Sequence, residues 1–262
     1  MIYFVGAGPG DVDLITVKGR KLLETADVLV YAGSLVSEAH VDFCRTDCEC
    51  YNSAGMTLEE VLNVLVEAEQ AEKMTVRLHT GDPTLYGAIR EQMSALDAQN
   101  LSYEIVPGVS SFTASCAVLQ REYTLPGVSQ TVIVTRLKGR TPVPEAEDLA
   151  LLAAHQSSMA IFLSVKQIDL VVEHLKEGYG RDDVPVAVVY KASWPDQHIL
   201  RGRLSDIADK VKAAGIKNFS QILVGDFLET DFERSQLYHP RFSHRFRQKK
   251  KFEYKMSAGV EG

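Results

Sequence analysis

Residues 1–11, MIYFVGAGPGD, decide how the chain begins to fold. Ile2 to Val5 form a short apolar run that predicts a buried β-strand, and the glycines after it permit a tight turn close to a ligand. The loop spacing is G-x-G-x-G rather than G-x-G-x-x-G, and the second predicted strand, Val28 to Tyr31, does not end in a carboxylate. Both features argue against a dinucleotide site, and the lysine of a phosphate-binding loop is also missing. The opening therefore predicts an α/β domain, with the loop serving either a different ligand or only the turn.

Two further loops follow predicted strands in the same way. Residues 77–87, RLHTGDPTLYG, lie between a predicted strand at Thr75 to Leu78 and a predicted helix at Leu85 to Leu96. Residues 106–114, VPGVSSFTA, join the strand at Tyr103 to Val106 to a helix at Ser110 to Leu119. The carboxyl ends of parallel strands meet at one edge of a sheet, where ligands tend to bind. We expect three such loops to expose backbone amides and carbonyls that suit a neutral adenosine and an amino-acid moiety.

The second and third loops also have other interpretations. Asp82 and Pro83 are typical of a helix start, with Asp as the capping residue and Pro at the first helical position. Ser110 is a possible nucleophile, but no G-x-S-x-G elbow surrounds it, which argues against a Ser-His-Asp hydrolase.

Strands and helices alternate through most of the chain, which predicts the α/β class with largely buried sheets. Beyond the elements above, the sequence predicts helices at 17–25, 57–71, 149–154, 168–177 and 204–214, and strands at 131–135, 160–163, 186–190 and 221–224. We predict an N-terminal α/β domain over residues 1–118, a C-terminal α/β domain over 124–240, and a basic tail over 241–262.

Composition narrows the classes of protein. The chain has 262 residues, of which 45% are hydrophobic, and its apolar runs are shorter than the ~20 residues of a membrane span. The start lacks the features of a signal peptide, so we expect a soluble cytoplasmic protein. Net charge is −7, and residues 241–255 hold seven Lys or Arg and one Glu, which leaves −13 on the rest. An acidic body argues against nucleic-acid binding. The tail either is solvated or contacts RNA or a partner.

Three of the four cysteines lie in residues 44–50, CRTDCEC. The spacing suggests a metal site, but it lacks the C-x-x-C pair and the second ligand cluster of common zinc sites. The sequence therefore favours reduced thiols at the edge of a strand, and no metal is predicted.

Taken together, in this order and spacing, the three loops resemble the tetrapyrrole methylase family over about residues 1–230. The resemblance implies two α/β domains with an active-site cleft between them, S-adenosylmethionine bound there as methyl donor, and a homodimer. Two segments, 135–145 (TRLKGRTPVPE) and 190–197 (YKASWPDQ), resemble the precorrin-4 C11-methyltransferase branch, including its cobalt-precorrin-4 form.

The resemblance also implies which residues contact the cofactor. Leu163 stands where several relatives have methionine, and Ala192 where several have glycine, which weakens that correspondence. The implied cofactor-binding residues are Pro9, Thr80, Gly81, Asp82, Leu85, Ser110, Ser111, Leu163 and Ala192. Methyl transfer to an electron-rich carbon needs alignment and exclusion of water more than a strong base, so Asp82 is only a candidate for orientation or electrostatics.

A corrinoid precursor carries many carboxylates, which arginine and lysine bind well. The candidate substrate-binding residues in the two branch segments are Arg136, Lys138, Arg140 and Lys191, each of which is otherwise ordinary surface charge. We expect Arg140→Ala to weaken tetrapyrrole binding without affecting S-adenosylmethionine. Trp194 is predicted to stack on the macrocycle or to lie in the core. The alternatives are a related methylase acting on uroporphyrinogen, another precorrin, RNA or a modified translation factor; a non-catalytic tetrapyrrole- or nucleotide-binding protein; and a nicotinamide oxidoreductase.

Overall fold

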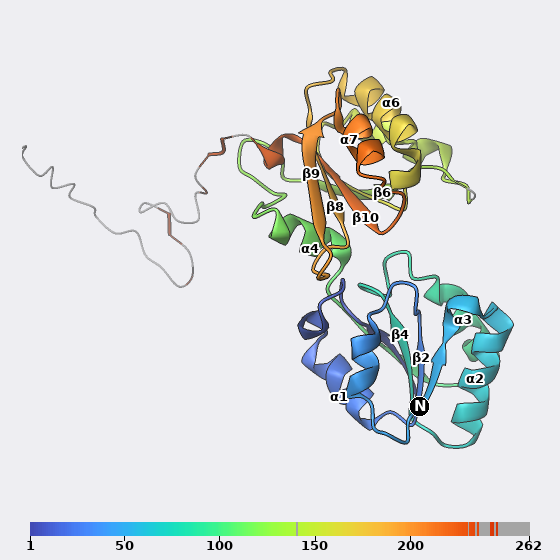
Figure 1. The fold of residues 1–262 in the computed structure, drawn as a ribbon. Coiled ribbons are helices and arrows are strands. Elements are labelled where there is room, and N and C mark those ends of the chain that lie inside the picture. Colours follow the sequence, from blue (N-terminus) through green and yellow to red (C-terminus); the bar gives the residue numbers. More distant parts are fainter. Residues whose placement is uncertain (140, 230, 234, 236–241, 244, 246–262) are drawn as a thin grey trace, which may run out of the picture.

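The computed structural model describes residues 1–262 except 140, 230, 234, 236–241, 244 and 246–262. The described chain forms two halves, each built on one five-stranded sheet, and Figure 1 shows them meeting end to end. This confirms the α/β class and the two-part architecture. The predicted limits of the two domains stay a prediction, and most of the predicted basic tail lies outside the described residues.

The first sheet is entirely parallel, with strand order β3-β2-β4-β1-β5. Its strands are β1 (Ile2–Gly6), β2 (Val28–Tyr31), β3 (Glu49–Asn52), β4 (Thr75–His79) and β5 (Tyr103–Val106). Helix α1 (Val17–Thr25) packs on one face, where Leu23 joins the core with Val5. Helices α2 (Leu58–Gln70) and α3 (Ile89–Asp97) cover the other face. Because all five strands run the same way, their carboxyl-end loops gather at one edge.

The second sheet is mixed, with order β6-β7-β10-β8-β9. Its strands are β6 (Val132–Arg136), β7 (Ser158–Phe162), β8 (Pro185–Tyr190), β9 (His198–Arg203) and β10 (Ser220–Val224). Strands β6 and β7 are parallel, whereas β10 is antiparallel to both of its neighbours. Helices α5 (Leu149–Ala153), α6 (Ile168–Tyr179) and α7 (Ile207–Ala213) pack on one face.

Helix α4 (Ser111–Val118) links the two halves. It follows the last strand of the first sheet, yet Ala114 and Cys116 pack into the core beneath the second sheet. The third loop, which opens this helix, therefore lies at the junction between the halves. Short 3-10 helices complete the described structure at Val12–Leu14, Glu38–Phe43, Ser53–Gly55, Glu145–Glu147, Val165–Gln167 and Asp226–Leu228.

The sequence predicted most elements to within a few residues, and the capping box at Thr57 and Glu60 is confirmed. Strands β3 and β9 were missed, because both are edge strands with largely exposed side chains and no apolar run. The helix predicted from Leu85 was wrong at its start, since α3 begins at Ile89 after a turn. Tyr86 and Ala88 there have φ of 55° and 48°, which a helix does not allow. The helix predicted from Leu204 likewise begins only at Ile207.

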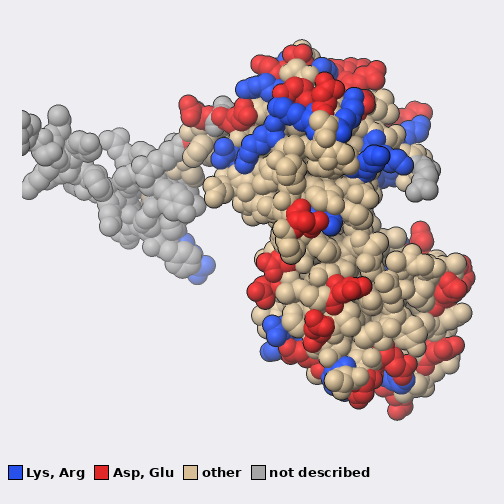
Figure 2. Space-filling view, in the orientation of Figure 1, with Lys and Arg blue, Asp and Glu red and all other residues tan. Residues whose placement is uncertain are grey.

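Charged side chains are unevenly distributed over one face of the molecule. On the face shown in Figure 2, Lys, Arg, Asp and Glu crowd the far end of the second half, while the surface between the halves is mostly uncharged. Among the described helices, none is both long enough and apolar enough to cross a membrane.

Candidate active site

The three predicted loops meet through their backbones. The Ala7 amide donates to the His79 carbonyl at 2.7 Å, and Gly8 and Gly81 exchange two hydrogen bonds of 3.3 and 2.8 Å. A Cβ atom at Gly108 would lie only 2.1 Å from the Gly81 carbonyl oxygen, and one at Gly6 would lie 2.6 Å from the Gly108 Cα. Only glycine, which has no Cβ atom, fits at these contacts, so the glycines allow the loops to touch.

Asp82 connects the second loop to the third. One carboxylate oxygen accepts a hydrogen bond from the Gly108 amide at 3.0 Å. The other accepts from the Thr84 amide at 2.8 Å and from the Thr84 hydroxyl. These bonds occupy both oxygens, so Asp82 fixes the shape of the loops and is poorly placed to act as a general base.

The third loop also contacts the second sheet. Ser110 is buried immediately before α4, and the Ser111 hydroxyl donates to Gln221 Oε1 on β10 at 3.2 Å. The Gln221 Nε2 atom is buried and has no hydrogen-bond partner among the described residues. Sequence reasoning missed Gln221, although an amide directly before the apolar run 222–224 is a signal that a partner is needed if it is buried.

Trp194 joins the glycine loop to the second half and is half-buried there, so it does not lie in a core, and its stacking on the macrocycle stays a prediction. Its Nε1 donates to the Pro9 carbonyl at 2.8 Å, and its indole lies against Gly10. Next to it, the Asp11 amide donates to Ser193 Oγ at 3.0 Å. The carbonyl of Pro9, a predicted cofactor residue, is therefore held by the branch segment 190–197.

Several residues at the junction have left-handed backbone conformations that are costly for side chains other than glycine. These are Tyr86, Ala88, Leu163, Lys191 and Ser193, with φ between 46° and 69°. Such strain often accompanies a functional site. Leu163, a predicted cofactor residue, is 73% exposed, and the rings of Tyr86 and Phe162 bring the halves together at 5.0 Å between centroids.

The remaining predicted cofactor residues lie in the same region. Thr80 is half-buried between β4 and Gly81, and the Leu85 amide donates to the Asp82 carbonyl at 3.2 Å. Ala192 is buried between two left-handed residues. The structure thus brings the first and second loops together with Ser110 and Ser111, and it attaches Ala192 to them through its neighbours Ser193 and Trp194.

Burial keeps the side chain of His79, the last residue of β4, uncharged. Desolvation, with a smaller effect from the nearby Arg77, lowers the pKa of His79 to about 3. His79 is therefore neutral at physiological pH, and its buried Nε2 has no partner within the described structure. A neutral imidazole adds no positive charge to this part of the molecule, which suits an uncharged ligand such as adenosine better than a phosphate.

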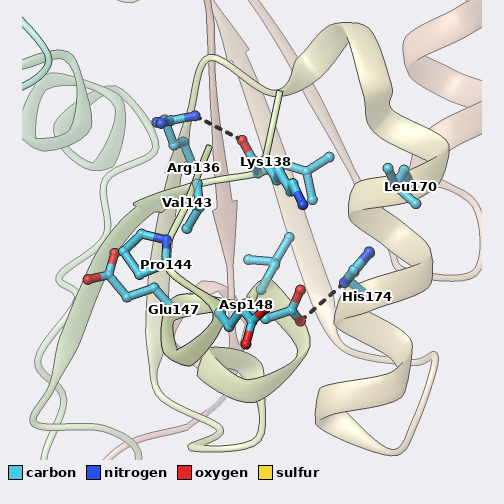
Figure 3. Close-up of a pocket in the computed structure, with 11 residues that line it drawn as sticks. Arg136, Lys138, Val143, Pro144, Glu147, Asp148, Leu170 and His174 are labelled. Atoms are coloured by element: carbon cyan, nitrogen blue, oxygen red, sulfur yellow. Dashed lines mark hydrogen bonds and ion pairs between the residues drawn. The ribbon is translucent and has the colours of Figure 1, made fainter. Parts of the chain in front are cut away.

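Two predicted substrate residues line a pocket in the second half (Figure 3). The pocket has a volume of about 370 Å³ and lies between the segment after β6 and helices α5 and α6. Arg136 is not free there, because its guanidinium donates to the carbonyls of Thr141 at 3.2 Å and Pro142 at 2.8 Å. It shapes the loop that carries Lys138, which is exposed at the pocket.

The chemistry of this pocket does not match a simple carboxylate-binding site. Glu145, Glu147 and Asp148 also line it, and Asp148 Oδ1 lies 3.3 Å from His174 Nδ1 (Figure 3). Elsewhere, Lys191 pairs with Asp196 at 2.6 Å and lies over the Trp194 ring. Arg140 lies outside the described residues.

The arrangement fits a small, largely neutral donor molecule. The three glycine loops meet through main-chain groups, the Gln221 Nε2 atom has no partner among the described residues, and Leu163 offers an exposed apolar side chain. A carboxylate and an ammonium of an amino-acid moiety find donors and acceptors among such backbone groups. The sequence has no P-loop at the start of a helix, which argues against a ligand rich in phosphate.

Comparison with known proteins agrees with this geometry. The family model for Tetrapyrrole (Corrin/Porphyrin) Methylases matches residues 1–208. A cobalt-precorrin-4 C(11)-methyltransferase from Methanocaldococcus jannaschii is 54% identical over 95% of this chain and 97% of its own. A precorrin-4 C(11)-methyltransferase from Pseudomonas aeruginosa is 45% identical over 94% and 98%. A solved cobalt-precorrin-4 methyltransferase, described as a cobalamin biosynthetic enzyme, has a TM-score of 0.85 and 46% identity over 87% of this chain and 96% of its own. The chain therefore belongs to the tetrapyrrole methylase family of S-adenosylmethionine-dependent methyltransferases, in its cobalt-precorrin-4 and precorrin-4 C11-methyltransferase branch.

Proposed function

We propose that this chain transfers the methyl group of S-adenosylmethionine to C11 of cobalt-precorrin-4, or of metal-free precorrin-4, in cobalamin biosynthesis. The observation that carries the proposal is the joining of the three glycine loops into one backbone surface, bridged by Ser111 to Gln221 of the second sheet. The identity of the relatives over nearly the whole chain supports the choice of acceptor.

The proposed donor site consists of the residues that the sequence indicates together with two that the structure adds. The backbone of the loops around Pro9, Gly81 and Ser110 would contact the amino-acid and ribose parts of the donor. Leu163 would cover its apolar surface. Gln221, whose amide nitrogen has no partner among the described residues, is the addition that can supply a directional hydrogen bond. Trp194 contributes by holding the Pro9 carbonyl.

S-adenosylmethionine supplies an electrophilic methyl group on a sulfonium sulfur. The role of the chain is to hold the methyl carbon in line with the attacking carbon and to keep water away. The described junction suits this role, because it is built from backbone groups and apolar side chains. Asp82 is proposed to act through the loops: its two oxygens hold the second and third loops together.

The proposed acceptor contacts are less direct than the donor contacts. Lys138 is exposed and makes no ion pair within the described residues, so it is the best placed to bind a peripheral carboxylate. Arg136 is proposed to shape the Lys138 loop, and Lys191 to support Trp194. Arg140 is proposed from the sequence alone. We further propose that the chain forms a homodimer, as the family resemblance implies, and that it works in the cytoplasm.

The test is mass spectrometry of the purified protein incubated with S-adenosylmethionine and precorrin-4, with and without cobalt. The proposal expects a gain of one methyl group on the macrocycle, and fragmentation should place it at C11. Preference for the cobalt-containing acceptor would assign the early-insertion pathway. Binding of S-adenosylmethionine without transfer to either form would contradict the proposed acceptor, and uroporphyrinogen would be tested next.

A further inference from the structure

Three cysteine sulfurs gather at the edge of the first sheet, in a part of the molecule that the methyl transfer does not use. The Sγ atoms of Cys44, Cys48 and Cys50 all lie within 4.8 Å of one another, and those of Cys48 and Cys50 are 3.9 Å apart. A tetrahedral zinc with Zn–S bonds of about 2.3 Å holds its sulfurs about 3.8 Å apart. The three sulfurs therefore need only small side-chain shifts to share one ion.

The backbone explains why they meet. Cys44 ends the 3-10 helix Glu38–Phe43, with its amide donating to the Val41 carbonyl at 3.0 Å. The Cys48 amide donates to the Arg45 carbonyl at 3.1 Å, which closes a tight turn. Cys48 and Cys50 are two residues apart at the start of an extended strand, so their side chains leave on the same face.

The turn is fixed from outside the cysteines. The Arg45 guanidinium binds Asp47 and Asp27, each at 3.0 Å. Asp27 in turn accepts a hydrogen bond from the Met74 amide at 2.7 Å, which attaches the turn to the start of β4. A ligand set held by such a supporting shell is organised before the ion arrives.

Exposure leaves one side of the cluster open. Cys44 and Cys48 are half-buried against the first core, whereas Cys50 is exposed. Within the described residues, no other His, Cys, Asp or Glu joins the group, so a water is the expected fourth ligand. The open side also provides the path by which an ion enters.

The position of the cluster separates it from the donor site. In the parallel register Glu49 pairs with Val28, so the turn lies at the amino end of the sheet. The three glycine loops lie at the carboxyl end. An ion here would fix the edge strand β3 to the segment before it rather than take part in methyl transfer.

We infer that residues 44–50 form a binding site for one thiophilic divalent cation, zinc being the expected ion, held by the thiolates of Cys44, Cys48 and Cys50. Thiolate ligands select zinc over hard cations such as magnesium or calcium. Sequence spacing alone favoured simple reduced thiols because no C-x-x-C pair is present. The turn at 45–48 brings the sulfurs together without that pair.

The test uses the full chain, reduced and stripped of metal, titrated with Zn²⁺ in competition with a chromogenic chelator and, separately, with Co²⁺. The inference expects one Zn²⁺ per chain and a thiolate-to-cobalt charge-transfer absorption band. Cys50→Ser is the informative variant, because the side chain is exposed and its loss should leave the fold intact. Since loss of a supporting contact alone costs 10–100-fold in affinity, loss of this ligand should weaken Zn²⁺ binding by at least about 100-fold.

Cys116→Ser is the matched control, because Cys116 lies in the other core and should leave Zn²⁺ binding unchanged. Equal Zn²⁺ affinity in wild type and Cys50→Ser, or absence of the charge-transfer band, would overturn the inference. So would a chain that binds no metal and instead loses two hydrogens on mild oxidation, because that result would assign two of the three cysteines to a disulfide.

Discussion

Replacing Gly10 by alanine should open the contact between the glycine loop and the second half. An added Cβ would lie 2.0 Å from Trp194 Cδ1 and 2.2 Å from Nε1, whereas ordinary contacts begin at about 3.4 Å. The indole or the loop must therefore move by about 1.4 Å. Such a shift breaks the 2.8 Å hydrogen bond from Trp194 to the Pro9 carbonyl. Lost hydrogen bonding of about 1 kcal/mol and overpacking of about 1–3 kcal/mol together predict a destabilisation of about 2–4 kcal/mol.

A double-mutant cycle separates this clash from other effects of alanine. In a Trp194→Ala background the added Cβ meets no indole, so Gly10→Ala should cost little there, because Gly10 does not have a positive φ. The coupling between the two positions should then exceed about 1.5 kcal/mol. Urea unfolding followed by circular dichroism measures the free energies, since Trp194 is the single tryptophan and is absent from half of the cycle.

Gly55→Ala is the matched control, because a Cβ at Gly55 meets nothing within 4 Å. It should change stability by less than about 0.5 kcal/mol. Calorimetric titration with S-adenosylhomocysteine should show weaker binding for Gly10→Ala and unchanged binding for Gly55→Ala. Additive effects at Gly10 and Trp194, with coupling under about 0.5 kcal/mol, would refute the reasoning.

Three further outcomes follow from the junction. The lowered pKa of His79 means that the unfolded chain binds a proton that the folded chain does not. Stability should therefore fall as the pH drops from about 6.5 toward 3, by up to about 1.4 kcal/mol per pH unit. Urea unfolding at pH 7 and pH 5 should show this loss of stability in the wild type and a smaller loss in His79→Gln. Leu163→Gly removes the strain of a left-handed backbone conformation and an exposed apolar side chain. It should maintain or raise stability while weakening S-adenosylmethionine binding roughly tenfold in a calorimetric titration. Gln156→Gly is the control, because it relieves the same backbone strain elsewhere and should leave binding unchanged. Gln221→Met should also weaken S-adenosylmethionine binding roughly tenfold, and undiminished binding would remove Gln221 from the donor site.

The sequence predicted those parts of the fold that depend on local pattern. Glycines after apolar runs located the three loops, and apolar runs located eight of the ten strands. The two missed strands, β3 and β9, lie at sheet edges, where one side has no neighbour and the apolar signal disappears. The turn before α3 was missed because Tyr86 and Ala88 have left-handed conformations that are uncommon for residues other than glycine.

The site was predictable only where it depends on residues close in sequence. The contact of Asp11 with Ser193 spans 182 residues, so no local pattern could place Trp194 on the glycine loop. Gln221 was missed for the same reason, since its partner Ser111 lies 110 residues away. Arg136 was a candidate for substrate binding, and the sequence could not show that its guanidinium also holds the carbonyls of its own loop.

Because Gly6, Gly81 and Gly108 touch through their main chains, two parts of this molecule should respond differently to substitution. The proposed donor surface depends on the absence of side chains at these positions, so most single substitutions there should damage it. The segments after β6 and β8, by contrast, carry exposed charged side chains such as Lys138 and Asp196. A library confined to residues 137–143 and 195–197 should therefore be able to alter acceptor preference while leaving the methyl donor unaffected.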